Sequence, residues 1–311
     1  MRDTFNILSL DGGGSKGVYT LGILREIEAL AGSQLYQEFD LIYGTSTGAI
    51  IAALLGLGRP VDEISNIYLA TVPEIMKQSS RAAKSQALFD HSTKILNGAR
   101  FEDFRTNVGI VATNYELAKP MIFKSSPKQS FSMAATFQPG FGCSVADAVR
   151  ASSAAFPFFE KVSLPTTNQG DVLLIDGGFI ANNPTLLAIA DAVHAFKIPR
   201  EKIKVLSLGT GIFKEPKLTF KQWVLGQVSY VRFVMRMLEA NSNTIEQLRA
   251  LLFRDIDTVR ISETFTQDEY AANLLTSDRV VLTKLMALGR NSFSKCELDL
   301  KKQFGWFNSH E

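Results

Sequence analysis

Residues 44–48 read Gly-Thr-Ser-Thr-Gly, which fits the G-x-S-x-G pattern of a serine nucleophile. The motif follows an apolar, strand-like run at 39–43 and precedes a helical pattern at 49–57. A serine on so sharp a turn holds its hydroxyl away from the sheet, and the next helix directs its positive end toward an incoming oxyanion. We therefore predict that Ser46 is a nucleophile. The competing interpretation is a small-residue turn that serves only close helix packing.

A serine hydroxyl needs a base, and the sequence holds only three histidines. His194 lies on a helical pattern, His91 in a loop-like stretch and His310 next to the C-terminus, so none of them suits a Ser-His-Asp triad. Asp176 is better placed because it ends the apolar strand 172–175, where we expect the C-terminal edge of a parallel sheet. We predict it as the direct base, although a turn aspartate bonded to its own backbone would show the same pattern.

Residues 11–17 read Asp-Gly-Gly-Gly-Ser-Lys-Gly, and successive glycines leave backbone N–H groups open to an anion. A phosphate loop fits poorly, because the lysine is followed by glycine and not by Ser or Thr. The dinucleotide spacing G-x-G-x-x-G is satisfied over 12–17, yet Asp40 begins the second strand, whereas the ribose-binding acid should end it. An oxyanion hole accounts for this loop and the serine turn together, with donors from the amides of Gly12, Gly13 and Gly14.

Strand-like runs and helical patterns alternate along the first two thirds of the chain. We expect strands at 5–10, 39–43, 108–114, 120–124, 172–175 and 204–208. Among the helices, Pro73 marks a break within 61–107, Ser144 caps a helix over 145–155 and Pro184 opens another. This alternation predicts an α/β fold with a mainly parallel sheet. After residue 211 no convincing strand is visible, so we expect a catalytic core at 1–215 and a helical extension at 216–311, packed together as one domain.

The composition excludes several classes of protein. Lys plus Arg number 33 against 31 Asp plus Glu, so the net charge of +2 is too small for bulk neutralisation of a DNA or RNA polymer. Cys143 and Cys296 fit neither a disulfide framework nor a zinc site, which indicates a reducing compartment and no bound metal. The uncharged stretch 41–58 is long enough to test as a membrane span, but its central glycine motif divides it into a buried strand and a buried helix. We expect a cytoplasmic protein.

The glycine loop with its basic residue, the G-x-S-x-G turn and the Asp-Gly-Gly turn occur in the order found in patatin-like phospholipases, which the chain resembles over about residues 5–211. The resemblance implies a three-layer α/β/α fold, a Ser46–Asp176 dyad, an oxyanion hole from the glycine loop, and hydrolysis without calcium or another cofactor. Segments 150–155 and 182–184 also resemble the family, and we expect them to shape the site. An auxiliary role beside the substrate is expected for Lys16, Thr47, Gly48, Gly177 and Gly178.

These observations predict a serine lipid acyl hydrolase of the phospholipase A type that acts on membrane phospholipids. With its helical extension the chain is similar to the effector phospholipases of bacterial antiphage systems, in which a cyclic di- or oligonucleotide switches on membrane degradation. Residues 200–260 carry 11 Lys plus Arg and 6 Asp plus Glu, a local balance of +5 that suits an anionic activator or an anionic membrane. The alternatives are a constitutive lipase or esterase on other acyl esters, a dinucleotide-binding protein and a lipid-binding scaffold with a dead site.

The segment 220–238 is apolar around more than one face and carries Lys221, Arg232 and Arg236. It fits a lid, a membrane-contact helix, a dimer face or a core helix, of which we favour the core helix. We expect peripheral association with the inner face of the membrane during activity, and a homo-oligomer stays open.

Overall fold

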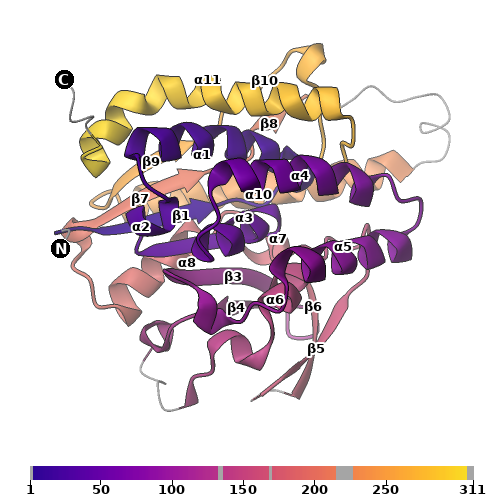
Figure 1. The fold of residues 1–311 in the computed structure, drawn as a ribbon, viewed down its shortest axis with the longest axis horizontal. Helices are drawn as coiled ribbons and strands as arrows, with labels where there is room; N and C mark the ends of the chain where they lie inside the picture. The colour runs from indigo at the N-terminus through magenta and orange to yellow at the C-terminus, as the bar shows by residue number, and fades with distance from the viewer. Residues whose placement is uncertain (1–2, 132–135, 168–169, 215–226, 307–311) are drawn as a thin grey trace.

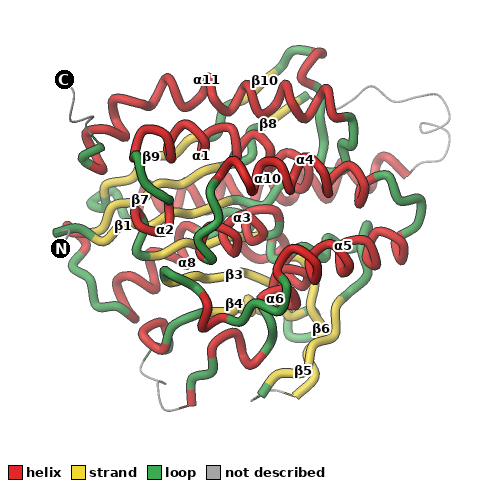
Figure 2. Tube along the Cα trace, viewed as in Figure 1, coloured by secondary structure: helices red, strands yellow, loops and turns green. Residues whose placement is uncertain are grey.

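A central mixed sheet organises the chain (Figures 1 and 2). The computed structural model describes residues 3–131, 136–167, 170–214 and 227–306. Within them, eight strands form one sheet in the order β5-β6-β3-β2-β1-β7-β9, with β4 paired to β3. The strands are β1 (Phe5–Leu10), β2 (Leu41–Thr45), β3 (Asn107–Asn114), β4 (Lys119–Lys124), β5 (Val162–Thr166), β6 (Gly170–Asp176), β7 (Ile203–Leu208) and β9 (Asp257–Ile261).

The centre of the sheet is parallel and one side of it is antiparallel. β1 pairs in parallel with β2 and β7, β2 with β3, and β7 with β9. β4 and β6 run antiparallel to β3, and β5 runs antiparallel to β6. The predicted α/β class with a mainly parallel sheet is confirmed. The antiparallel pairing of β4, β5 and β6 was not predicted.

Helices cover both faces of the sheet, which gives the three layers (Figure 1). Side chains alternate between the two cores: on β2, Ile42 belongs to one, whereas Leu41 and Tyr43 belong to the other. The first core is covered by α1 (Gly17–Ala31), α3 (Thr47–Gly56), α4 (Val61–Met76), α6 (Val145–Ser152) and α11 (Arg279–Phe304). The second is covered by α7 (Gly178–Ala181), α8 (Thr185–Ala190) and α10 (Gln227–Leu252). The remaining helices are α2 (Leu35–Glu38) and α5 (Arg81–Leu96).

The prediction that no strand follows residue 211 is wrong. β9 extends the main sheet, and β8 (Ile212–Phe213) and β10 (Thr264–Phe265) form a separate parallel pair. β9 is a short edge strand with charged residues at both its first and fourth positions, so it lacks the apolar run by which the central strands were recognised. β5 was missed for a similar reason, because its side chains alternate in burial and it contains a proline.

Pro73 does not break a helix, because α4 continues through it to Met76. Val72, Pro73 and Ile75 are all buried, so packing of this face outweighs the hydrogen bond that proline cannot donate. The helix capped by Ser144 ends at Ser152, three residues before the predicted end. His91 lies inside α5 and not in a loop, with its Nε2 3.2 Å from Glu74 Oε2.

α11, the last described helix, packs directly on α1 through two glycines. A side chain at Gly22 of α1 would collide with the Met286 carbonyl, and one at Gly289 of α11 would collide with the Tyr19 carbonyl. The 41–58 stretch is divided into β2 and α3, and no helix among the described residues is both long and apolar enough to span a bilayer.

Candidate active site

Ser46 occupies a strained turn between β2 and α3. Its φ of 54° and ψ of −119° lie outside the regions that non-glycine residues prefer. The flanking glycines are required by close backbone contacts, since a side chain at Gly44 would collide with the Gly48 carbonyl and one at Gly48 with the Leu10 carbonyl. The predicted strand-turn-helix geometry of the G-x-S-x-G motif is therefore present.

Asp176 reaches Ser46 by a route that the sequence analysis did not foresee. β2 pairs in parallel with the first part of β3, and the last pair of residues is Thr45 of β2 and Val111 of β3. β6 pairs antiparallel with the rest of β3, from Asn114 to Ala112, and Ala112 lies opposite Asp176. β4 occupies the other edge of β3, so β2 and β6 approach each other end to end along one edge. The expected parallel-sheet edge at Asp176 is wrong, but the head-on meeting of two strands brings the two side chains to one point.

Asp176 is buried, with 3% of its surface exposed, and its carboxylate is held from two sides. Oδ1 accepts a hydrogen bond from the Gly178 amide at 2.7 Å, and the Ser46 side chain lies beside the carboxylate. Burial raises the pKa of Asp176 from 3.8 to about 6, and the interactions with Ser46 and with the Gly178 amide oppose the rise. A carboxylate with this pKa is ionised near neutral pH and accepts a proton more readily than an exposed aspartate does.

The small-residue segment 150–155 fastens the backbone of both residues in place. The Ser46 amide donates to Ser152 Oγ at 2.9 Å, and Ser153 Oγ donates to the Ser46 carbonyl at 3.2 Å. The Asp176 amide donates to the Ala154 carbonyl at 3.0 Å. The expectation that this segment shapes the site is confirmed, and it does so by hydrogen bonds in addition to close packing.

The amides of the glycine loop are not equivalent. Gly12 donates its N–H to the Asn182 carbonyl at 2.9 Å, so that amide is already occupied and Gly12 does not fit the predicted oxyanion hole. Gly13 and Gly14 line the catalytic cavity beside Ser46, and in the described part of the chain their amides donate to no other group. Gly14 has a φ of 56°, which glycine adopts without strain. The loop therefore offers two free donors next to the serine.

Lys16 does not face the catalytic cavity. Its side chain is 6% exposed and donates to the Gly211 carbonyl at 3.4 Å, on the opposite side of the glycine loop. Burial lowers the pKa of Lys16, and the carboxylates of Glu239 and Asp11 oppose this effect. The expected auxiliary role beside the substrate does not match this position, whereas support of the loop from behind does.

The other predicted auxiliary residues divide between the cavity wall and the scaffold. Thr47 lines the cavity and hydrogen-bonds the hydroxyl of Tyr68, which in turn donates to the Gly14 carbonyl at 2.6 Å. Gly177 allows close packing, because a side chain there would collide with the Val111 carbonyl. Gly48 likewise packs against the Leu10 carbonyl, and Gly178 donates its amide to Asp176.

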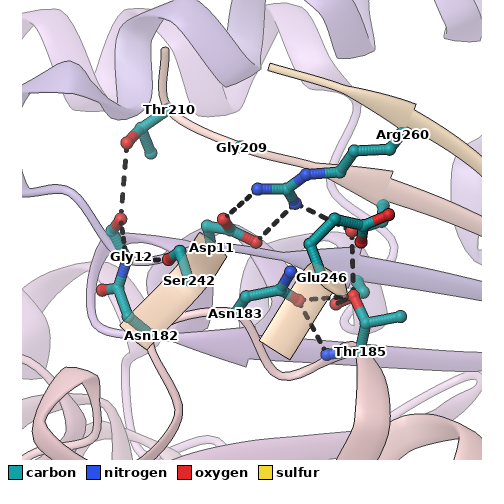
Figure 3. Close-up of polar contacts among 12 residues, drawn as sticks. Asp11, Gly12, Asn182, Asn183, Thr185, Gly209, Thr210, Ser242, Glu246 and Arg260 are labelled. Atoms are coloured by element: carbon teal, nitrogen blue, oxygen red, sulfur yellow. Dashed lines mark hydrogen bonds and ion pairs between the residues drawn. The ribbon is translucent and has the colours of Figure 1, made fainter. Parts of the chain in front are cut away.

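An ion pair behind the glycine loop was missed by the sequence analysis (Figure 3). The Arg260 guanidinium, from β9, binds both carboxylate oxygens of Asp11 at 2.5 and 2.8 Å and also donates to Ser207 Oγ at 2.8 Å. Burial raises the pKa of Asp11, and Arg260 opposes that rise. Asp11 and Arg260 are 249 residues apart in sequence, and nothing in the local pattern signals their pairing.

Asn182 joins the glycine loop to α10. In addition to accepting from Gly12, it donates from Nδ2 to the Gly12 carbonyl at 3.2 Å and to Ser242 Oγ at 2.7 Å (Figure 3). Its own amide donates to Asn241 Oδ1 at 2.9 Å. The expected shaping role of the 182–184 segment is thus a set of bonds between the loop and the extension.

The cavity above Ser46 is narrow and largely apolar. Its volume is about 60 Å³, below the roughly 300–1,000 Å³ of typical ligand pockets. Besides the dyad and the loop it is lined by side chains of α3, α4, α5 and α10, among them Ile50, Val72, Ile75, Leu88 and Leu238. An acyl chain would find an apolar surface here, but the walls must separate to admit it.

Comparison with known proteins agrees with this geometry. Residues 8–189 match the family described as patatin-like phospholipase. The chain belongs to the patatin-like phospholipase family. The family, the fold class and the enzyme class predicted from the sequence are thereby confirmed.

Individual patatin-like relatives are similar over most of the chain. A "cUMP-AMP-activated phospholipase" from Escherichia coli is 47% identical over 296 residues, covering 95% of this chain and 92% of the relative. A "cGAMP-activated phospholipase" from Vibrio cholerae is 27% identical, covering 83% and 79%. The crystal structure of VipD from Legionella pneumophila, with 13% identity and a TM-score of 0.50, covers 97% of this chain and 67% of VipD and is similar in fold.

Proposed function

We propose that Ser46 and Asp176 are the catalytic dyad of a phospholipase A-type acyl hydrolase that cleaves fatty-acyl esters of membrane phospholipids. The observation that carries this proposal is the meeting of β2 and β6 on β3, which sets a strained serine against a buried carboxylate of raised pKa. The two free amides of Gly13 and Gly14 beside them supply the remaining part of such a site.

The mechanism follows from these positions. Asp176 accepts the Ser46 proton while Oγ attacks the ester carbonyl carbon, and the amides of Gly13 and Gly14 bind the oxyanion that forms. When the intermediate collapses, the C–O bond breaks, Asp176 returns the proton to the leaving alkoxide, and an acyl-enzyme results. Asp176 then deprotonates a water molecule, which attacks the acyl carbon. The bond to Ser46 Oγ breaks, Asp176 returns the proton to Oγ, and the fatty acid is released. Every group in this sequence belongs to the chain, the substrate or water.

Labelling with a fluorophosphonate probe tests the nucleophile. We expect the wild-type chain to be labelled, Ser46→Ala to lose labelling completely, and Asp176→Asn to slow it by roughly a hundredfold or more, because the general base is removed. Ser153→Ala is a useful comparison, since it keeps the nucleophile and removes only the bond to the Ser46 carbonyl. Undiminished labelling of the Ser46→Ala protein would refute the assignment.

We further infer that a cyclic oligonucleotide switches the enzyme on. The relatives named above are described as activated by cUMP-AMP or cGAMP. The narrow cavity above Ser46 supports a resting state that requires opening. Acyl-ester release should rise severalfold or more when cUMP-AMP is added, and a broad panel of cyclic nucleotides without effect would favour a constitutive lipase or esterase instead.

Activity at a membrane requires a contact surface, for which we propose the described start of α10. Phe233 and Met237 are 60% and 51% exposed, and Arg236 lies between them with its side chain also exposed. Residues 220–226 of the predicted segment lie outside the described residues. Phe233→Ser with Met237→Ser should reduce flotation with anionic vesicles of phosphatidylglycerol. The same samples, analysed by size-exclusion chromatography with and without nucleotide, test for a homo-oligomer.

A further inference from the structure

A second cavity, of about 620 Å³, lies between α5 and the 159–163 segment that leads into β5. Its volume is typical of a ligand site, unlike that of the catalytic cavity. We call it the Arg150 cavity and define it by Ser85, Phe89, Arg150, Phe159, Lys161 and Ser163.

Arg150 lines this cavity and keeps part of its side chain exposed. Its guanidinium stacks 4.9 Å from the ring centre of Phe89, and Nη2 makes a long contact of 3.3 Å with Asp147 Oδ1. The Nε atom is buried and has no partner among the described residues. Because Nε has almost no accessible surface, a ligand would meet Arg150 through the exposed part of its side chain, 23% of which is accessible.

Further cations lie around the same cavity. The Lys161 amino group is 3.3 Å from the ring centre of Tyr115 and 5.2 Å from that of Phe156, and the Arg81 guanidinium is 5.9 Å from the Phe156 ring. Glu160 is the carboxylate in the lining, and it is exposed. The lining thus holds two cations and one carboxylate, and Asp147 outside the lining is paired with Arg150.

The Arg150 cavity adjoins the catalytic cavity. Leu88 and Phe159 line both, and together with Ile75 they form a small apolar cluster separate from the two main cores. Ala154 also lines the Arg150 cavity, and its carbonyl accepts the hydrogen bond of the Asp176 amide. A ligand in the Arg150 cavity would therefore lie against the wall that must move to admit an acyl chain.

We propose that the Arg150 cavity binds a phosphodiester anion. A phosphodiester carries one negative charge and pairs of acceptor oxygens that match the guanidinium fork, while Phe89 and the alanines of α5 supply an apolar surface for the groups attached to it. Two ligands related to the proposed function contain this group, the phospholipid headgroup and the cyclic dinucleotide. The choice of ligands rests on the proposed function, but binding itself requires no turnover.

Direct binding tests the site with full-length protein carrying Ser46→Ala, which prevents hydrolysis. The probes are cUMP-AMP and dihexanoyl phosphatidylglycerol below its micelle concentration, measured by calorimetry. Arg150→Gln and Lys161→Gln should each raise the Kd of the bound probe by roughly tenfold or more, because a charge-assisted hydrogen bond is lost. Lys284→Gln, an exposed lysine of α11, is the matched control. Lys161→Gln keeps the test valid if Arg150→Gln fails to fold.

Kinetics with Ser46 intact distinguish the sources of the phosphodiester. In the Lys161→Gln variant, a raised Kd for cUMP-AMP with an unchanged KM for the lipid identifies the nucleotide. A raised lipid KM with unchanged hydrolysis of neutral p-nitrophenyl butyrate by the same variant identifies the headgroup. Binding and KM values equal to those of the Lys284→Gln control overturn the proposal. A chain that binds either probe through Arg150 but hydrolyses no ester would refute the proposed function and leave the cavity assignment intact.

Discussion

Burial makes the Asp176 carboxylate a stronger base and also lowers the free energy of unfolding of the chain when the carboxylate is ionised. Removing the carboxylate from water disfavours its charged form, which raises its pKa to about 6. The interactions with Ser46 and with the Gly178 amide recover part of this cost without cancelling it. Two properties that can be measured separately, activity and stability, should therefore report the same titration.

Activity should fall as the pH falls through about 6. Protonated Asp176 cannot accept the Ser46 proton, so kcat/KM is expected to be constant above about pH 7 and to drop roughly tenfold per pH unit below the pKa. The profile should be measured on a neutral ester, so that substrate ionisation does not contribute. A profile that stays flat down to about pH 5 would mean that the base titrates like an exposed aspartate.

Asp176→Asn should stabilise the fold at alkaline pH. Between pH 3.8 and about 6 the folded chain binds more protons at this site than the unfolded chain, so the free energy of unfolding falls as the pH rises through that window. The full difference corresponds to roughly 3 kcal/mol, which asparagine removes because it does not ionise.

Urea unfolding at about pH 8 and about pH 4 measures this effect. The free energy of unfolding of Asp176→Asn should exceed that of the wild type at the higher pH and approach it at the lower pH. Asp171→Asn, an exposed position on the same strand, is the control and should change little. An advantage of Asp176→Asn that is equal at both values would point to a cause other than ionisation.

At the scale of elements, two strand ends and one edge strand decide the site. The registers of β2 and β6 on β3 determine the separation of Ser46 from Asp176, so each side chain owes its position to a different part of the chain. β9 also contributes to the site, because it places Arg260 beside the carboxylate of Asp11, the residue that precedes the glycine loop. Elements remote in sequence thus support the loop that carries the proposed oxyanion donors.

Arg260→Met should reduce both stability and activity. It leaves the buried Asp11 carboxylate without its partner, a change that typically costs about 3–5 kcal/mol, and it loosens the loop that carries Gly13 and Gly14. Urea unfolding and kcat on a neutral ester measure the two effects, with the exposed Arg254→Met as control. Adding Asp11→Asn should recover part of the stability, and strictly additive losses would show that the pair is not coupled.

At the scale of the whole molecule, the C-terminal part is built into the core. β9 continues the sheet beside β7, α11 packs on α1, and α10 is bonded through Asn182 to the glycine loop. We propose that 1–215 and 216–311 form one domain, in agreement with these contacts. A signal received by the extension would then reach the oxyanion donors without crossing a linker.

Gly289→Ala tests this docking. Alanine favours a helix over glycine by roughly 1 kcal/mol, yet its methyl group would collide with the Tyr19 carbonyl, and overpacking of this kind costs roughly 1–3 kcal/mol. We therefore expect a lower free energy of unfolding. Asn291 is exposed on the same helix, so Asn291→Ala changes helix propensity without a collision and should be neutral or slightly stabilising. A Gly289→Ala protein more stable than the wild type would show that the two helices separate easily.

Local patterns alone predicted much of this protein. Six of the strands and the backbone of the G-x-S-x-G turn follow from residues adjacent in the chain, whose types set the local backbone. The proposed roles of Ser46, Asp176 and the glycine loop rest on the same kind of local pattern. Apolar runs marked the central strands because these are buried on both faces. The family resemblance rested on the same local motifs.

Tertiary structure decided what depends on pairing between distant segments. The antiparallel entry of β6, the addition of β9 and the bond of Arg260 to Asp11 leave no local signal, since an edge strand or an ion pair is favourable only when its partner is present. The same applies to Gly12, whose amide is taken by Asn182, and to Lys16, which lies behind the loop. Sequence determined which groups could react, and the register of strands on β3 determined that they meet.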